Sequence, residues 1–226
     1  MPPIECPLQF TQVEADVAGM ASRVTVVQTF MNPSRDPIEA IYTFPLPADA
    51  SVDRMRIKIG DRVVEGEIKP RGEARAIYES ARAAGQTAAL LDQERPNIFT
   101  QSIANVAPGA VVEVEISYIS LLKYEDGQYE FDFPMVVGPR NAMHAPDPDS
   151  ITPPIVYHGM RTGTDVALTV HLNAGTSLKQ VGSTLHAINI NKLSAGRYDI
   201  TLARKDEIPN RDFILKWTPA GNGVTE

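Results

Sequence analysis

The run RGEARAIYESARAAGQTAALLDQERPNIFTQSIANVAPGAVVEVEISY, residues 71–118, carries the strongest structural signals in the chain. An amphipathic helical pattern, an extended run, a Pro-Gly turn and an alternating strand follow one another almost without a spacer. Val112, Val114 and Ile116 alternate with polar residues, which is the period of a β-strand with one solvated face. The run therefore predicts a packing unit of one helix against β-structure, and nothing in it resembles a reaction centre.

A single helix is predicted over residues 71–85. Its apolar residues at helical spacing are Ala74, Ile77, Tyr78 and Ala81. They form one face of a 3.6-residue period, while Glu79 and Arg82 form a weak surface pair on the other face. Gly85 accepts a left-handed backbone and predicts the C-terminal stop. Because a helix of about three turns is marginal alone in water, we expect its apolar face to dock on a larger body.

Short strands separated by turn signals surround this helix. They are predicted over 8–17, 22–30, 37–44, 52–59, 62–68, 88–92, 98–106, 111–118 and 128–133, and then over 165–172, 177–181, 185–190, 197–203 and 212–217. Asp126-Gly127 is the clearest hairpin signal. Regular short strands favour a sandwich or a partly closed barrel over a parallel sheet. The predicted fold class is mainly β, a sandwich-like body with one packed helix, followed by a second small β-rich segment.

The chain is predicted to divide into three parts. Residues 1–140 form the first domain, and residues 141–164 form a Pro-rich connection with little periodicity. The strand pattern resumes in residues 165–226. A segment of this size is small for an independent core, so we do not expect it to fold alone.

Composition excludes several functions. The 226 residues carry a net charge of −7 and no cluster of Lys and Arg, whereas nucleic-acid binding depends on such cations. No apolar run approaches the length of about 18 residues that marks a membrane helix. The N-terminus lacks the charged and apolar regions of a secretion signal. Cys6 is the single cysteine, which excludes an internal disulfide and a thiolate metal cluster.

Several dispersed motifs agree in order and spacing with a known family. They are FPLP at 44–47, the helix residues Glu73, Ala74, Tyr78, Ala81 and Gly85, PNIF at 96–99, NVAPG at 105–109 and FPMVVGPR at 133–140. Together they resemble the VIT domain, the module that opens the heavy chains of the inter-alpha-trypsin inhibitor and also occurs in a vault-associated protein. The resemblance covers residues 8–140 and implies a mainly antiparallel β domain with one packed helix.

The motifs are most similar to the bacterial branch of this family, in which a von Willebrand factor A domain usually follows. The resemblance implies that the chain is the N-terminal part of a longer extracytoplasmic or cell-surface protein. Its implied partner is the A domain of the same protein, with other proteins or extracellular matrix as further partners. The D-x-S-x-S metal motif of an A domain does not occur in the sequence. The metal-dependent adhesion of A domains is therefore not expected of these residues.

No catalytic, cofactor or metal site is predicted. His144, Asp147 and Asp149 offer too few ligands for calcium or zinc, so a solvated loop is favoured over weak cation binding. The remaining histidines, His158, His171 and His186, show no metal-ligand spacing. No serine lies in the context of an activated nucleophile. The chain is therefore predicted not to be an enzyme.

Carbohydrate or matrix binding by a β-sandwich is the alternative function. Glycoside hydrolysis needs two carboxylates that face each other across a cleft, whereas Glu113 and Glu115 alternate on one strand face. Glu130 and Asp132 do the same. Trp217 follows an alternating run and is expected in the core rather than on a sugar-binding surface. The favoured function is a non-enzymatic protein-interaction or scaffold domain.

Four residues are predicted to have structural or partner-contact roles. Tyr78 is expected to place its ring between helix and sheet, and Phe99 to enter the core. Asn97 is expected to satisfy backbone groups at a bend, as asparagine often does. Arg140 is expected to pair with an acidic side chain near the Pro-rich connection.

Overall fold

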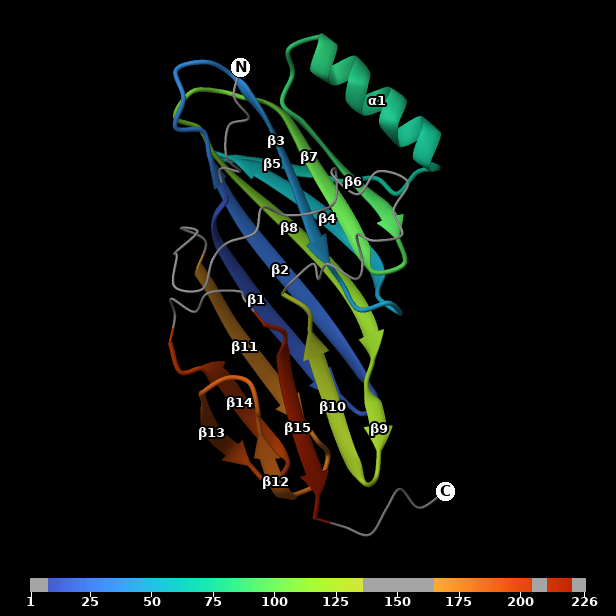
Figure 1. The fold of residues 1–226 in the computed structure, drawn as a ribbon, viewed down its shortest axis with the longest axis vertical. Helices are drawn as coiled ribbons and strands as arrows, with labels where there is room; N and C mark the ends of the chain where they lie inside the picture. Colours follow the sequence, from blue (N-terminus) through green and yellow to red (C-terminus); the bar gives the residue numbers. More distant parts are fainter. Residues whose placement is uncertain (1–7, 136–164, 205–210, 221–226) are drawn as a thin grey trace.

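A computed structural model describes residues 8–135, 165–204 and 211–220. Within these ranges fifteen strands form three sheets around one hydrophobic core, and one helix lies beside them (Figure 1). The elements are β1 Leu8–Ala18, β2 Ala21–Met31, β3 Ile38–Pro45, β4 Ser51–Ile59, β5 Arg62–Glu65, α1 Arg71–Ala83, β6 Ala88–Arg95, β7 Ile98–Val106, β8 Val111–Leu121, β9 Lys123–Glu125, β10 Gln128–Phe133, β11 Asp165–Asn173, β12 Leu178–Gly182, β13 Ile188–Ser194, β14 Arg197–Leu202 and β15 Phe213–Pro219. The predicted class, mainly β with one helix, is confirmed.

The largest sheet has the strand order β13-β14-β11-β1-β2-β8-β4-β5. Its central strands alternate buried and more exposed residues, because one face covers the core and the other faces solvent. Val112, Val114 and Ile116 have no exposed surface, as their period-two spacing predicts. The opposite face, which we call the outer face, is left for contact with water or partners.

Two smaller sheets cover the inner face of the large sheet. The sheet β3-β7-β6 lies over its upper part, and the sheet β12-β15-β10-β9 lies over its lower part (Figure 1). Buried side chains of all three sheets belong to one cluster, which includes Phe99, Phe131 and Trp217. The layers therefore share one core.

The C-terminal strands complete sheets that the N-terminal strands begin. β11 pairs with β1 in parallel, from Phe10↔Asp165 to Ala18↔Asn173, and β15 pairs with β10 in antiparallel fashion. The parallel pair departs from the antiparallel pattern, and it requires a long connection between the two strands. The Pro-rich residues 141–164 lie outside the described residues, so the domain bounds stay a prediction.

The helix buries a narrower face than its apolar pattern predicts. Tyr78 is buried, Ala74 and Ala81 are half-buried, and Ile77 is 51% exposed. The expectation that Ile77 docks beside Tyr78 is wrong: α1 lies against the edge strand β6, where Arg71 and Arg75 pair with Asp92, and Ile77 stays outside this contact. Gly85 has a φ of +73° just beyond the helix, which confirms it as the C-terminal stop.

The predicted hairpin at Asp126-Gly127 is confirmed. Both residues have positive φ, 51° and 78°, and Gln128 pairs with Glu125 across the turn. Two consecutive left-handed residues give the turn whose twist matches that of paired strands. The sequence therefore set the register of β9 and β10 locally.

Several predicted strands have different bounds in the structure, and two of them show why. The strand predicted at 185–190 is displaced towards the C-terminus as β13, because the tight turn at Gly196 pairs β13 with β14. The strand predicted at 62–68 is shorter, because its pairing with β4 ends after the bond from the Gly66 N–H to the Met55 carbonyl (2.7 Å). Pairing partners, rather than local propensity, fix both ends.

Candidate functional site

Tyr78 ties the middle of the helix to the neighbouring sheet. Its ring is 5% exposed, and its hydroxyl donates to the Glu39 carboxylate of β3 at 2.7 Å. Arg82 approaches the same carboxylate at 3.1 Å. Burial, and then the hydrogen bond to Glu39, raises the pKa of Tyr78, so the phenol remains a donor. The predicted position of Tyr78 between helix and sheet is the position it occupies.

The first half of the helix is held by a buried carboxylate that sequence reasoning missed. Asp92 of β6 has a side chain only 8% exposed, and it accepts from Arg71 Nε at 2.8 Å and from Arg75 Nη2 at 2.7 Å. Glu94 also contacts Arg71 at 2.8 Å. Arg71 and Arg75 lie one helical turn apart, so both reach one carboxylate. The spacing of two arginines before an acidic β-strand was the available signal.

Removal of this carboxylate is expected to loosen the helix. Asp92→Ala deletes the shared acceptor of two charge-assisted hydrogen bonds, and we expect it to lower the free energy of unfolding by about 2 kcal/mol. Urea denaturation followed by circular dichroism measures this change. Glu79→Ala removes only the exposed pair with Arg82 and should cost less than about 0.5 kcal/mol. Equal effects of the two variants would contradict the view that Asp92 holds the helix through Arg71 and Arg75.

Asn105 holds the C-terminal end of the same helix. Its side-chain Nδ2 donates to the carbonyls of Arg82 and Gln86, both at 2.9 Å. Its own backbone has a φ of 52°, a conformation that asparagine tolerates better than most residues. A helix end leaves carbonyls without intrahelical donors. Asn105, part of the NVAPG motif, therefore supplies a cap from β7.

The other predicted contact residues lie apart from one another. Phe99 is 5% exposed and stacks on Phe44 with ring centroids 6.3 Å apart. Asn97 lies half-exposed in the turn before β7, where its backbone carbonyl, rather than its side chain, accepts from the Leu46 N–H at 3.2 Å. Arg140 lies outside the described residues. Cys6, His144, Asp147, Asp149 and His158 also lie outside them. The members of the predicted set that the structure describes therefore form no common site.

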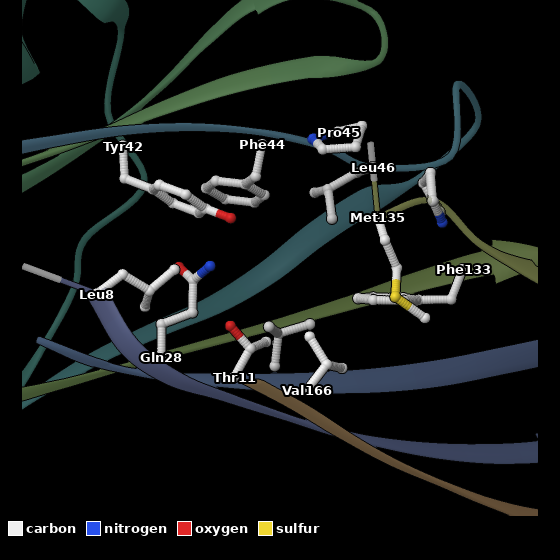
Figure 2. Close-up of a pocket in the computed structure, with 12 residues that line it drawn as sticks. Leu8, Thr11, Gln28, Tyr42, Phe44, Pro45, Leu46, Phe133, Met135 and Val166 are labelled. Atoms are coloured by element: carbon white, nitrogen blue, oxygen red, sulfur yellow. The ribbon is translucent and has the colours of Figure 1, made fainter. Parts of the chain in front are cut away.

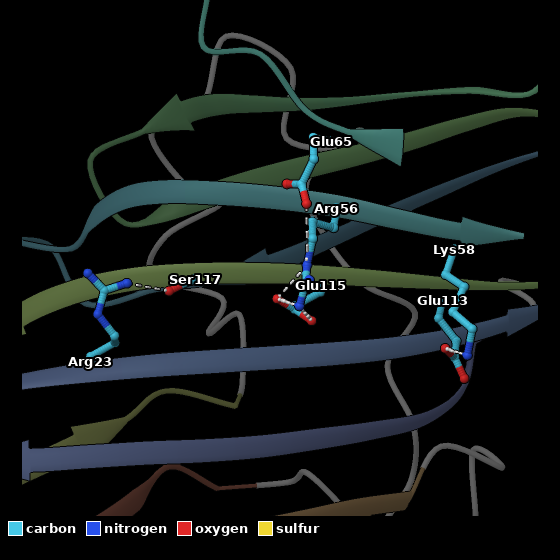
Figure 3. Close-up of polar contacts among 7 residues, drawn as sticks. All are labelled: Arg23, Arg56, Lys58, Glu65, Glu113, Glu115 and Ser117. Carbon is cyan, nitrogen blue, oxygen red and sulfur yellow. Dashed lines mark hydrogen bonds and ion pairs between the residues drawn. The ribbon is translucent and has the colours of Figure 1, made fainter. Parts of the chain in front are cut away.

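The outer face of the large sheet carries a row of paired charges (Figure 3). Arg56 Nε donates to Glu115 at 2.9 Å, and Lys58 Nζ donates to Glu113 at 3.0 Å, in both cases from β4 to β8. Further along this face, Arg23 contacts Asp53 at 2.7 Å and Ser117 at 3.1 Å. The two β8 glutamates face the solvated side, as predicted, and each pairs with a cation. This arrangement neutralises charge and does not build an acid–base pair.

Two of the hollows in the described part of the chain lie near residues already discussed. One of about 40 Å³ lies between the large sheet and the chain near β3 and β10, where Thr11 and Gln28 lie among apolar side chains such as Phe44 (Figure 2). A water needs about 10–15 Å³ of such volume, so this hollow holds only a few. The other, about 150 Å³, lies on the outer face beside Val27 and Val63. Neither provides an enclosed cleft for an organic substrate.

His171 joins three strands on the outer face. Its Nδ1 lies 2.8 Å from Asp199 of β14, and its Nε2 lies 3.1 Å from Glu14 of β1. The hydrogen bond to Asp199 raises the pKa of His171 above its ordinary value, partial burial opposes this, and the bond to Glu14 adds to it. The protonated imidazole thus bridges two carboxylates. No local pattern predicts this cluster, because its three members are far apart in the chain.

This cluster predicts a pH-dependent stability. A folded-state pKa above the unfolded one means that the stabilisation is present below the ordinary pKa of histidine and is lost as pH rises through the raised value. We expect less than about 1 kcal/mol, because the side chains are partly exposed. Urea unfolding at pH 5.5 and pH 8.5 measures it, and His171→Gln should remove this pH-dependent component. An unchanged pH profile in His171→Gln would rule out the bridge.

The structure also shows where the residues considered for sugar binding and hydrolysis lie. Trp217 is 2% exposed and stacks on Tyr129, so it offers no surface for a sugar ring. Glu130 accepts from Lys216 at 2.9 Å. In the ranges that the structure describes, no three metal-ligating side chains converge. In the same ranges, no helix has the length and apolar character needed to cross a membrane.

Comparisons with known proteins agree with this architecture. Residues 8–118 match the family model of the Vault protein inter-alpha-trypsin domain. The chain is 38% identical over 133 residues to protein mono-ADP-ribosyltransferase PARP4 of Mus musculus, a match that covers 59% of this chain and 7% of that protein. It is 28% identical over 147 residues to von Willebrand factor A domain-containing protein 5A of Homo sapiens, with 64% and 19% covered.

One further sequence relative and one solved structure are also similar to this chain. Inter-alpha-trypsin inhibitor heavy chain H6 of Homo sapiens is 28% identical over 119 residues, with 52% of this chain and 9% of that protein covered. A crystal structure of a Legionella pneumophila protein with a provisional nutrient-binding assignment shares the fold, with a TM-score of 0.53, 12% identity, and 93% and 66% covered. The chain spans less than a fifth of each of the named sequence relatives. The match over residues 8–118 shows that these residues belong to the VIT domain family.

Proposed function

We propose that this chain is a non-enzymatic protein-interaction and scaffold domain, the VIT part of a longer protein that also carries a von Willebrand factor A domain. The observation that carries the proposal is the VIT match shared with relatives named for von Willebrand factor A domains. The VIT region itself is the part shared with PARP4, and the match covers 7% of that protein. The transferase name of PARP4 is therefore no reason to assign transferase activity to this chain.

The chemistry of the described surface supports a contact role. Glu113 and Glu115 pair with β4 cations instead of with each other. Asp92 and Glu39 are occupied by the helix. Carboxylates engaged in this way hold the fold together, and a rigid β framework presents a stable surface to a partner at low entropic cost. The proposed partner is the A domain of the same protein.

Cross-linking of the full-length protein tests this proposal. A lysine-reactive reagent should join lysines of this chain, such as Lys58 and Lys123, to lysines of the A domain at a yield that does not depend on protein concentration. A heat-unfolded sample serves as the control and should lose the specific links. A gene that encodes no A domain, or a folded protein without any interdomain link, would contradict the proposal.

A further inference from the structure

An exposed apolar patch lies at the lower end of the outer face. It consists of Met20 in the β1–β2 turn and of Ile119 and Leu121 on β8, which are 55%, 39% and 69% exposed. Ala21 pairs with Leu121, and Arg23 pairs with Ile119, so the three side chains are neighbours on one surface. We call them the end patch. Clustered exposed apolar residues with a polar rim are typical of interaction sites.

The backbone beneath the end patch is held rigidly. The Leu121 N–H donates to the Asp49 carboxylate at 3.0 Å, and the Leu122 N–H donates to the Met20 carbonyl at 2.9 Å. The hydroxyls of Ser22 and Ser120 are 2.9 Å apart just behind the patch. A surface that is ordered before binding loses little entropy when a partner docks. The end patch therefore has the rigidity of a binding surface.

The rim of the end patch carries an excess of acidic side chains. Asp16, Asp49 and Asp53 are exposed around it, and Asp16 lies opposite Arg23 in the β1–β2 register. Arg23 and the exposed Arg54, which lies opposite Ser117 in the β4–β8 register, are the cations beside it, and Arg23 already pairs with Asp53 at 2.7 Å. Charge complementarity selects a partner whose own apolar contact is ringed by basic side chains.

The chain leaves the described fold close to this end. Leu121 lies just before β9, β9 pairs with β10, and the Gln128 side chain contacts Thr218 of β15 at 3.3 Å. Neighbouring strands are about 4.8 Å apart. A domain that follows β15 is thus tethered at the same end of the fold as the end patch, where its effective concentration is high. In Figure 1 the end of β15 and the β9–β10 hairpin lie at the same lower end.

We infer that the end patch is the docking surface for the von Willebrand factor A domain of the same protein, which meets it with an apolar contact ringed by basic residues. This inference rests on the proposed function and specifies its surface. Leu121 is the most exposed of the three side chains and inserts deepest into the partner. Met20 and Ile119 surround it, and the paired Arg23 and Asp53 form the polar rim.

Hydroxyl-radical footprinting of the full-length protein tests the inference at the side chains themselves. Met20 should be oxidised slowly in the wild type, because the A domain covers it. Leu121→Ser removes the central contact and should shift the balance towards the undocked form about tenfold or more, with faster Met20 oxidation. Leu193→Ser is the matched control, since Leu193 is 58% exposed on the edge strand β13, and it should leave Met20 protected.

The outcomes distinguish a failure of the inferred docking surface from a failure of the proposed function. If interdomain cross-links persist while Met20 is oxidised equally fast in wild type, Leu121→Ser and Leu193→Ser, the A domain docks elsewhere and the inference fails alone. If no interdomain cross-link forms in any variant, the proposed function fails with it. Protection that disappears on dilution would identify a second copy as the occupant and would also overturn the inference. Circular dichroism confirms that each variant is folded, and Met20→Gln, read by interdomain cross-link yield, provides a second variant.

Discussion

Asn32→Ala is expected to lower the free energy of unfolding by about 3 kcal/mol, because Asn32 is a fully buried hydrogen-bonding centre. Its Nδ2 donates to the carbonyls of Val106 at 2.7 Å and Asp36 at 2.9 Å, and its Oδ1 accepts from the Ser34 N–H at 2.8 Å. The truncation leaves the Val106 carbonyl buried without this donor. Urea denaturation monitored by tryptophan fluorescence and circular dichroism measures the loss.

The matched control lies two residues away. Ser34→Ala removes an exposed hydroxyl that donates to the same Asp36 carbonyl at 2.6 Å, and we expect it to cost less than about 1 kcal/mol. If Asn32→Ala and Ser34→Ala were equally mild, the turn after β2 would be held by its backbone bonds alone. Those bonds join Asn32 to Ala110 and Gly109 of the β7–β8 turn.

Trp217→Ala is expected to destabilise the whole described fold by about 4 kcal/mol, in the range of large aromatic deletions from cores. The indole is 2% exposed and stacks on Tyr129 at 5.6 Å between centroids. Because β15 pairs with β10, the cavity forms where the C-terminal strands join the N-terminal ones. Differential scanning calorimetry should show one transition that moves to lower temperature as a unit.

Tyr124 provides the control for this prediction. It lies at the other end of the same aromatic row, 4.6 Å from Tyr129, but it is 44% exposed. Tyr124→Ala should cost less than half as much as Trp217→Ala, since little buried surface is lost. Two separate transitions, with only one shifted by Trp217→Ala, would show that the C-terminal strands unfold independently of the VIT region.

Many local features could be predicted from the sequence because their causes lie within a few residues. The alternation of valine and glutamate in 111–118 predicts one buried face. Asp126-Gly127 supplies the backbone conformations of a tight hairpin, and Gly85 supplies the helix stop. The dispersed motifs identify the VIT family for the same reason, since each motif is a local turn, strand or helix. Trp217 was likewise correctly predicted to lie in the core.

What the sequence could not show are the contacts between residues that are distant in the chain. Asp92 receives Arg71 and Arg75 only because β6 returns beneath the helix, so the docking face of α1 is set by charge and Ile77 is left in solvent. Bounds of strands such as β13 depended on the neighbour that each strand meets.

By itself, the sequence determined the mainly β class, the single helix, the tight turns and the family of residues 8–118, because periodicity and left-handed backbone positions act over a few residues. Tertiary structure decided the parallel pairing of β1 with β11, the His171 bridge and the grouping of Met20 with Leu121. Each of these depends on which strand lies beside which. Local spacing does not encode that choice, because it arises when distant strands bury their apolar faces against one another.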